Sequence, residues 1–267
     1  MTAPTVAEAT RLVAMLASIG VLVISLEWLV ARSVWTGAGI LSWPVIGQTY
    51  RDRSPAAVAV RDRLGRPAGT TCGLVAAMAA AVVVLLPGSD VVHTAGLATM
   101  TATMALVRLR FLPPGDGGDQ MLVLVLAVLT IGSMVGTPLA HHLVLAFLAF
   151  QVVVAYVTAA RSKLVVAAWR SGAVLRDVLA TDTFGTPRLA AWLAQEGSVR
   201  RARALTWAVI GLELTLPLAL VAPRPAAIAI LAAGAVFHLS TGLVMGINRF
   251  LWPYLALYPA VLAINPF

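Results

Sequence analysis

Ionisable side chains within apolar stretches are the residues of this sequence best placed to do chemistry. Glu27, Glu213 and His238 lie inside long apolar segments, and Lys163, the single lysine among nineteen basic residues, closely follows another. Charged groups inside a bilayer are costly and are usually functional or paired. A lysine, unlike an arginine, can also give up its proton and act as a base. These four residues are therefore the first candidates for a site.

A structural role also explains each of these residues. Glu27 could pair with Arg32 in the headgroup region, and a lone histidine such as His238 commonly makes a hydrogen bond between helices. A buried carboxylate must find a partner or become neutral. A contact from Lys163 or from an arginine would satisfy Glu213 without any catalysis. The residues alone leave both interpretations open.

A glycine-rich turn, PPGDGGDQM at residues 113–121, holds two further candidates, Asp116 and Asp119. An aspartate that caps the following helix accounts for the pattern, and an ion or phosphate site is the alternative. The turn lacks the Lys-Ser/Thr ending of a phosphate-binding loop. Cys72 is the single cysteine, and no cluster has the spacing of metal ligands, so we expect no bound metal.

The candidates lie in a chain with the composition of an integral membrane protein. Hydrophobic residues make up 60% of its 267 residues, charged residues make up 11%, and the mean hydropathy is +0.91. Soluble domains are about half apolar and about a quarter charged. The net charge of +8 does not indicate nucleic-acid binding, because the arginines lie between apolar runs rather than along one helix face. We expect membrane lipids, and no nucleic acid, as partners.

Apolar runs long enough to cross a bilayer determine the expected fold. A membrane-spanning helix needs about 20 apolar residues. Eight segments are candidates, the last of them short: 12–31, 70–87, 91–109, 121–138, 142–160, 205–222, 226–247 and 251–264. We predict an all-α, polytopic integral membrane protein of about eight transmembrane helices, in a single domain over residues 1–267. The two long gaps, 32–69 and 161–204, are each predicted to hold an interfacial helix.

The distribution of positive charge predicts the orientation in the cell membrane, because loops rich in arginine and lysine stay cytoplasmic. Six basic residues fall in 32–69, two in 108–120, eight in 161–204 and one at Arg249, against Arg11 and Arg224 on the other side. Eight spans then place both termini outside and loops 32–69 and 161–204 in the cytoplasm. This orientation would bring the four candidate residues to a similar depth, towards the cytoplasmic face.

The stretch around Lys163 resembles a known family. YVTAARSKLVVAAWRSGAVL is similar to a segment of the vitamin K-dependent gamma-glutamyl carboxylases and of the related bacterial HTTM (horizontally transferred transmembrane) proteins. In that segment a tyrosine leads to Lys-Leu and then to Trp-x-x-Gly. The matching residues here are Tyr156, Lys163, Leu164, Trp169 and Gly172.

A second stretch, FHLSTGLVMGINRFLWPYLALYP, resembles a late helix of the same family. In that helix an aromatic residue and a histidine are followed by Ile-Gly and then by Phe and Pro. The residues that keep this pattern are Phe237, His238, Ile247, Phe250 and Pro253.

GGDQM, at residues 117–121, also resembles the Gly-Gly-Asp turn of the bacterial members. The resemblance implies an HTTM-like membrane domain in which Lys163 is the base that deprotonates a reduced quinone, such as menaquinone hydroquinone. It implies that His238 is a second polar group of the same pocket, and we expect Glu213 to help shape that pocket. The other residues that we expect in the pocket, for a substrate or lipid, are Tyr156, Trp169, Phe250 and Trp252.

Two functions are compatible with these expectations. The first is a quinone- or lipid-dependent membrane enzyme that modifies or matures a peptide, a carboxylase-like lyase or oxygenase. The second is a non-catalytic membrane subunit that binds a lipid or peptide in a multi-protein export or maturation complex, where Lys163 neutralises Glu213 or a lipid phosphate. A transporter is a third possibility, but paired broken helices are not visible in the sequence.

Overall fold

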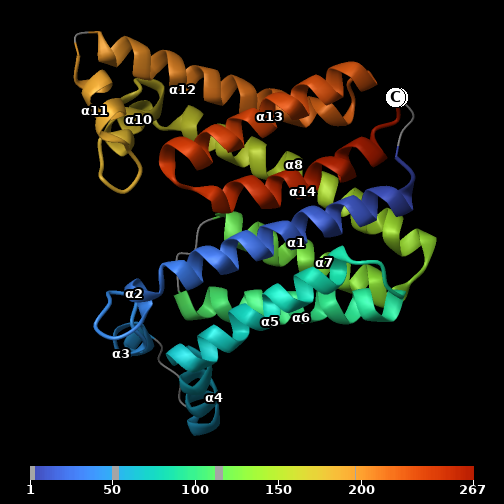
Figure 1. The fold of residues 1–267 in the computed structure, drawn as a ribbon. Coiled ribbons are helices and arrows are strands. Elements are labelled where there is room, and N and C mark those ends of the chain that lie inside the picture. Colours follow the sequence, from blue (N-terminus) through green and yellow to red (C-terminus); the bar gives the residue numbers. More distant parts are fainter. Residues whose placement is uncertain (1–3, 50–53, 112–116, 196) are drawn as a thin grey trace. The chain divides into compact units, whose positions relative to one another are not determined.

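The protein is helical throughout the part of the chain that its structure describes. The computed structural model describes residues 4–49, 54–111, 117–195 and 197–267, and within these ranges it contains helices but no strand (Figure 1). The predicted all-α class is therefore confirmed for these residues.

Long helices coincide with all eight predicted apolar segments. They are α1 (Val6–Val30), α5 (Pro67–Leu85), α6 (Asp90–Phe111), α7 (Gly117–Val135), α8 (Pro138–Val165), α12 (Ser198–Thr215), α13 (Arg224–Met245) and α14 (Asn248–Ile264). A 3-10 helix, η2 (Leu216–Leu220), continues α12. Among the described helices, six are long and apolar enough to cross a membrane: α1, α5, α7, α8, α12 with η2, and α13. These helices support a membrane-embedded protein.

The other two long helices, α6 and α14, fall outside this group of six. α6 has several threonines and ends with Arg108 and Arg110 in its last turn, which lowers its hydropathy. α14 has 17 residues and contains two prolines, Pro253 and Pro259. It is shorter than the roughly 20 residues that usually cross a bilayer.

Several helices extend beyond the apolar segments that predicted them. α8 continues to Val165 rather than ending at residue 160, and α12 begins at Ser198 rather than at residue 205. Basic residues occupy these extensions, and their long side chains can reach water while the helical backbone continues. As a consequence, Lys163 lies within α8, two residues before its end.

Each gap that was predicted to hold one interfacial helix holds several short helices. The first gap contains α2 (Arg32–Trp35), α3 (Trp43–Ile46), the 3-10 helix η1 (Gly47–Thr49) and α4 (Pro55–Gly65). The second contains α9 (Ala167–Arg170), α10 (Ala173–Leu179) and α11 (Pro187–Ala194). Glycines with positive φ, such as Gly37 and Gly172, interrupt these segments, because that conformation ends a right-handed helix.

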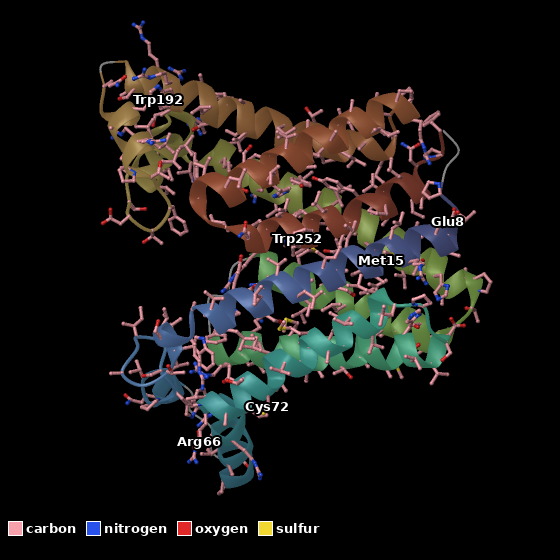
Figure 2. The ribbon with its side chains drawn as sticks, in the orientation of Figure 1. Glu8, Met15, Arg66, Cys72, Trp192 and Trp252 are labelled. Carbon is pink, nitrogen blue, oxygen red and sulfur yellow. The ribbon has the colours of Figure 1, made fainter. Side chains whose placement is uncertain are left out.

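Contacts between residues divide the chain into two compact units, residues 1–13 with 142–267 and residues 14–141. In the first unit α13 packs against α14 and η2, and α12 packs against α9, α10 and α11. Leu179, Leu193 and Ala202 form a small buried cluster where α10, α11 and α12 meet, and Trp192 packs against it (Figure 2).

In the second unit, α6 packs against both α5 and α7. The hydroxyl oxygens of Thr101 and Thr130 lie 2.9 Å apart and join α6 to α7. The ring of Trp28 stacks on that of Phe111 with centroids 3.6 Å apart. These contacts bury polar and aromatic groups against one another, as expected for helices that pack within a membrane.

Candidate functional site

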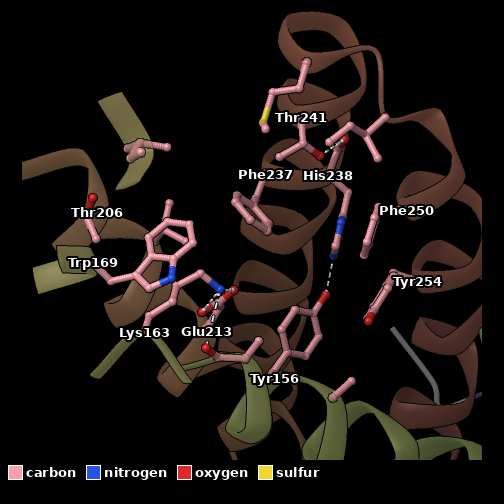
Figure 3. A pocket seen from close by; sticks show the side chains of 16 residues that line it. Tyr156, Lys163, Trp169, Thr206, Glu213, Phe237, His238, Thr241, Phe250 and Tyr254 are labelled. Carbon is pink, nitrogen blue, oxygen red and sulfur yellow. Dashed lines mark hydrogen bonds and ion pairs between the residues drawn. The ribbon is translucent and has the colours of Figure 1, made fainter. Parts of the chain in front are cut away.

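A cavity of about 390 Å³ lies in the first unit, with walls formed mainly by α8, α12, α13 and α14. Most of its wall is apolar, and Tyr156, Lys163, Glu213 and His238 bring polar groups to it (Figure 3). Sites for small molecules are typically cavities of roughly 300–1,000 Å³ with apolar walls and a few polar groups. This cavity has both properties.

α8 places three of the lining residues on one face. Tyr156, Ala159 and Lys163 all line the cavity, and their spacing of three and then four residues is that of neighbours on one side of a helix. Ala159, between the two polar residues, has a small side chain and leaves space in front of the helix. The last turn of α8, which lies beyond the predicted apolar segment, thus places Lys163 in the cavity wall.

An ion pair joins α8 to α12 in this wall. Lys163 Nζ donates to Oε1 of Glu213 at 2.7 Å and to Oε2 at 3.0 Å, and makes a longer contact of 3.4 Å with the carbonyl oxygen of Ala159. The Lys163 side chain is 17% exposed and that of Glu213 is 5% exposed. The buried carboxylate of Glu213 thus has the partner that it requires.

The short helix α9 adds an aromatic ring beside the ion pair. The Nζ atom of Lys163 lies 5.6 Å from the centroid of the Trp169 ring, within the range of a cation–π contact. Gly172, three residues later, has a φ of 84° and lies so close to Ala202 and Arg203 that a Cβ atom would collide with their backbone. Trp169 thus joins α9 to Lys163 of α8, and Gly172 allows the chain after α9 to lie close against α12.

A chain of hydrogen bonds lies in the same cavity. The hydroxyl oxygen of Tyr156 lies 2.5 Å from Nε2 of His238 and 3.1 Å from the hydroxyl of Tyr258. His238 is buried, and its Nδ1 atom has no hydrogen-bond partner in the described part of the chain. Gly234 lets Tyr258 approach, since a Cβ atom there would collide with the Tyr258 hydroxyl. This chain connects α8, α13 and α14.

Aromatic rings line the wall next to this chain. The ring of His238 stacks on Tyr254 with centroids 4.6 Å apart, and Tyr254 stacks in turn on Phe250 at 6.1 Å. Phe237 also lines the cavity, 5.1 Å from the ring of His238. The wall is thus flat and aromatic, which suits an apolar ring or chain.

Six of the residues proposed from the sequence line this cavity together: Lys163, Glu213, His238, Tyr156, Trp169 and Phe250. Trp252 is not among the lining residues, and it is half-buried elsewhere on α14 (Figure 2). Residues that are two positions apart in an α-helix are rotated from each other by about 200° around the helix axis. Phe250 and Trp252 therefore point to opposite sides of α14.

The other sequence candidates lie apart from this cavity in the chain. Asp116 is outside the described residues, and Asp119 is in the first turn of α7, in the second unit. Glu27 also belongs to the second unit, in α1. Within the described ranges, no group of three or more His, Cys, Asp or Glu side chains is arranged to hold a metal ion.

Sequence reasoning missed two tyrosines of the site, Tyr254 and Tyr258. Both are on α14, and with Phe250 they recur every fourth residue, which is the spacing of one helix face. This aromatic repeat was available in the sequence as a signal. Their partners on α8 and α13 could not be read from it.

Comparisons with known proteins return no relatives. No protein-family model matches the chain, and no curated protein or solved structure is significantly similar to it. The chemistry of the cavity therefore carries the functional argument. It combines a paired ammonium and carboxylate, a His-Tyr-Tyr chain with Tyr156 at its centre, and an apolar wall, which together can hold an amphipathic molecule and exchange a proton with it.

Proposed function

We propose that this protein is an HTTM-like membrane enzyme that binds a quinone or a similar lipid in the cavity and uses the Lys163–Glu213 pair as its base. Lys163 is the residue to which the family resemblance assigns this role. A peptide to be modified or matured is the proposed substrate. The observation that carries the proposal is the meeting, in one apolar cavity, of the Lys163–Glu213 ion pair and the hydrogen-bonded pair of Tyr156 and His238.

The cavity residues fit a quinone-type ligand. The aromatic wall of Phe237, Phe250 and Tyr254 would contact an apolar ring, and Tyr156 or His238 could hydrogen-bond to a ring oxygen. A reduced quinone would supply reducing equivalents to the reaction. The protein's own part is to orient the ligand, to exclude water through the apolar wall, and to hold a proton at the Lys163–Glu213 pair.

A non-catalytic membrane subunit is the second candidate. It is favoured by one observation, the engagement of Lys163 with both carboxylate oxygens of Glu213. A closed ion pair of this kind would join α8 to α12 and neutralise both buried charges without proton transfer. In this role the cavity would bind a lipid or peptide for a companion subunit.

We propose an eight-span topology in the cell membrane, with α6 and α14 as the spans beyond the six most apolar helices. The packing of α6 against α5 and α7, and of α14 against α13, supports their inclusion. The excess of arginine in loops 32–69 and 161–204 supports a cytoplasmic location for both loops and an outside location for both termini.

Analysis of bound lipid tests the proposed function. The full-length protein, purified in mild detergent, is extracted with organic solvent and the extract is analysed by mass spectrometry. We expect a quinone or another neutral amphiphile in near-stoichiometric amount. Ala159→Phe should expel it, because Ala159 lines the cavity.

Val157→Phe is the matched control, since Val157 is on α8 but 43% exposed and is not a lining residue. It should retain the ligand. A wild-type protein without bound amphiphile, or equal retention by both variants, would contradict the proposal.

A further inference from the structure

The hydrogen-bonding capacity of Lys163 is already used within the protein. An ammonium group has three protons and no acceptor. The Nζ atom of Lys163 has three acceptors in contact: both carboxylate oxygens of Glu213, at 2.7 and 3.0 Å, and the carbonyl oxygen of Ala159 at 3.4 Å. Lys163 therefore keeps no proton with which to bind a ligand directly.

Glu213, by contrast, has more hydrogen-bond acceptor positions than donors that occupy them. An ionised carboxylate offers about four acceptor positions and no donor. In the described part of the chain, hydrogen bonds to its oxygens come from Lys163 alone, one to each oxygen. The side chain is 5% exposed and lines the cavity, so water reaches it poorly. Each carboxylate oxygen therefore has one donor and keeps a further acceptor position, on the cavity side of the residue, that the described residues leave unused.

We infer that Glu213 accepts a hydrogen bond from the hydroxyl group of a neutral amphiphile bound in the cavity, and that Lys163 is a positioning residue that holds the carboxylate in place. This inference rests on the proposed function, because it assumes that the cavity binds an amphiphile. It narrows the ligand to a hydroxyl-bearing molecule, and it assigns the ligand contact to Glu213 rather than to Lys163.

The same balance of donors and acceptors excludes other chemical groups as partners of Glu213. An ether or a ketone has no proton to donate to its carboxylate, and a quinone has one only in its reduced, hydroquinone form. An anionic head group would bring a second negative charge to the carboxylate, while Lys163 is already neutralised by that carboxylate. A hydroxyl makes a stronger hydrogen bond when it donates to an ionised group than when it donates to a neutral group. The expected preference for the hydroxyl over a matched ether is about 10- to 100-fold in affinity.

Three alkylated aromatic probes of similar size test this inference: nonylphenol, its methyl ether nonylanisole, and the anion nonylbenzoate. Binding of radiolabelled probe is measured at neutral pH on the full-length protein in phosphatidylcholine nanodiscs, with empty nanodiscs subtracted. We expect nonylphenol to bind at least about tenfold more tightly than either of the other two.

Two variants separate the role of Glu213 from general packing. The double variant Lys163→Met with Glu213→Leu replaces the pair by apolar side chains, a change that buried pairs often tolerate, and should bind nonylphenol and nonylanisole with equal affinity. Lys163→Arg keeps a cation beside the carboxylate and should retain the preference for nonylphenol.

The outcomes distinguish the two proposals. If the wild-type protein binds nonylphenol and nonylanisole equally, the cavity binds amphiphiles but the assignment to Glu213 is wrong. The assignment is also wrong if the double variant keeps the preference, or if Lys163→Arg, while folded, loses it. If the wild-type protein binds none of the probes, the proposed function itself fails.

Discussion

Lys163 Nζ lies 2.7 Å from Oε1 and 3.0 Å from Oε2 of Glu213, which joins the end of α8 to the end of α12 across 50 positions of the sequence. Both side chains are largely buried. Removal of one partner of such a pair leaves an uncompensated charge, whereas replacement of both by apolar residues does not. The effect of a substitution at either position therefore depends on the other.

The pair predicts a strong thermodynamic coupling. Lys163→Met or Glu213→Leu alone should lower the free energy of unfolding by about 3–5 kcal/mol. The double variant should be close to the wild type, because neither charge remains. Denaturation of the purified protein in detergent, followed by circular dichroism, measures the cycle. Losses that simply add in the double variant would show that the two residues act independently.

The Tyr156 hydroxyl predicts a second destabilisation. Tyr156→Phe leaves both His238 Nε2 and the Tyr258 hydroxyl without this partner, which should cost about 1–3 kcal/mol of stability. Tyr258→Phe removes the longer contact alone and should cost less. The thermal midpoints of the two variants in detergent provide the comparison. An equal or larger loss for Tyr258→Phe would contradict the central position of Tyr156.

Gly172 and Gly197 provide a matched pair of backbone tests. Both have positive φ, 84° and 79°, but a Cβ atom on Gly172 would collide with Ala202 and Arg203, whereas one on Gly197 meets nothing within 4 Å. Gly197→Ala should cost about 1 kcal/mol through its conformation alone. Gly172→Ala should cost clearly more and loosen α9 from α12. Thermal midpoints measure both effects, and similar losses would show that the close approach at Gly172 carries no cost.

The two aromatic residues Phe250 and Trp252 should differ in ligand binding. Phe250 lines the cavity and Trp252 does not. Phe250→Ala should lower the affinity for nonylphenol several-fold through lost apolar contact, and Trp252→Ala should leave it unchanged. The nanodisc assay measures both. A larger loss for Trp252→Ala would place the ligand on the other side of α14.

Cysteine labelling tests the proposed orientation. In a Cys72→Ala background, a cysteine at the exposed position Ser171 should react with a membrane-impermeant maleimide only after cells are permeabilised. A cysteine at Ser89, which is exposed between α5 and α6, should react in intact cells. The reverse pattern would invert the topology and place Lys163 near the outer face.

Hydropathy was sufficient to locate the eight long helices, because apolar length is the property that a membrane selects. Hydropathy predicted that α8 ends and α12 begins at the limits of their apolar segments, whereas both helices extend further. Helical hydrogen bonds continue through basic residues whose side chains reach water, and hydropathy does not record those bonds. The error mattered at Lys163, which is a helical residue of α8 rather than part of the following loop.

Rarity was a good guide to the polar residues of the site. The scarcity of ionisable groups in apolar helices singled out Glu27, Lys163, Glu213 and His238. The structure brings the last three to one cavity, whereas Glu27 belongs to the other unit. The pairing of Lys163 with Glu213 rather than with another residue could not be deduced, because it depends on how α8 packs against α12. Trp252 was expected in the pocket together with Phe250, and the helical rotation of α14 separates the two.

α8 continues without a break from Pro138 to Val165 and carries Tyr156 and Lys163 seven positions apart. At 1.5 Å per residue, their Cα atoms are separated by about 10 Å along the axis. Because a helix does not shorten when a ligand binds, α8 holds the backbone positions of Tyr156 and Lys163 at a fixed separation. A molecule could engage both groups at once only if the spacing of its own polar atoms matches the spacing at which α8 and its neighbours hold these groups. If the cavity binds an amphiphile as proposed, this fixed spacing would discriminate between ligands by length as well as by polarity.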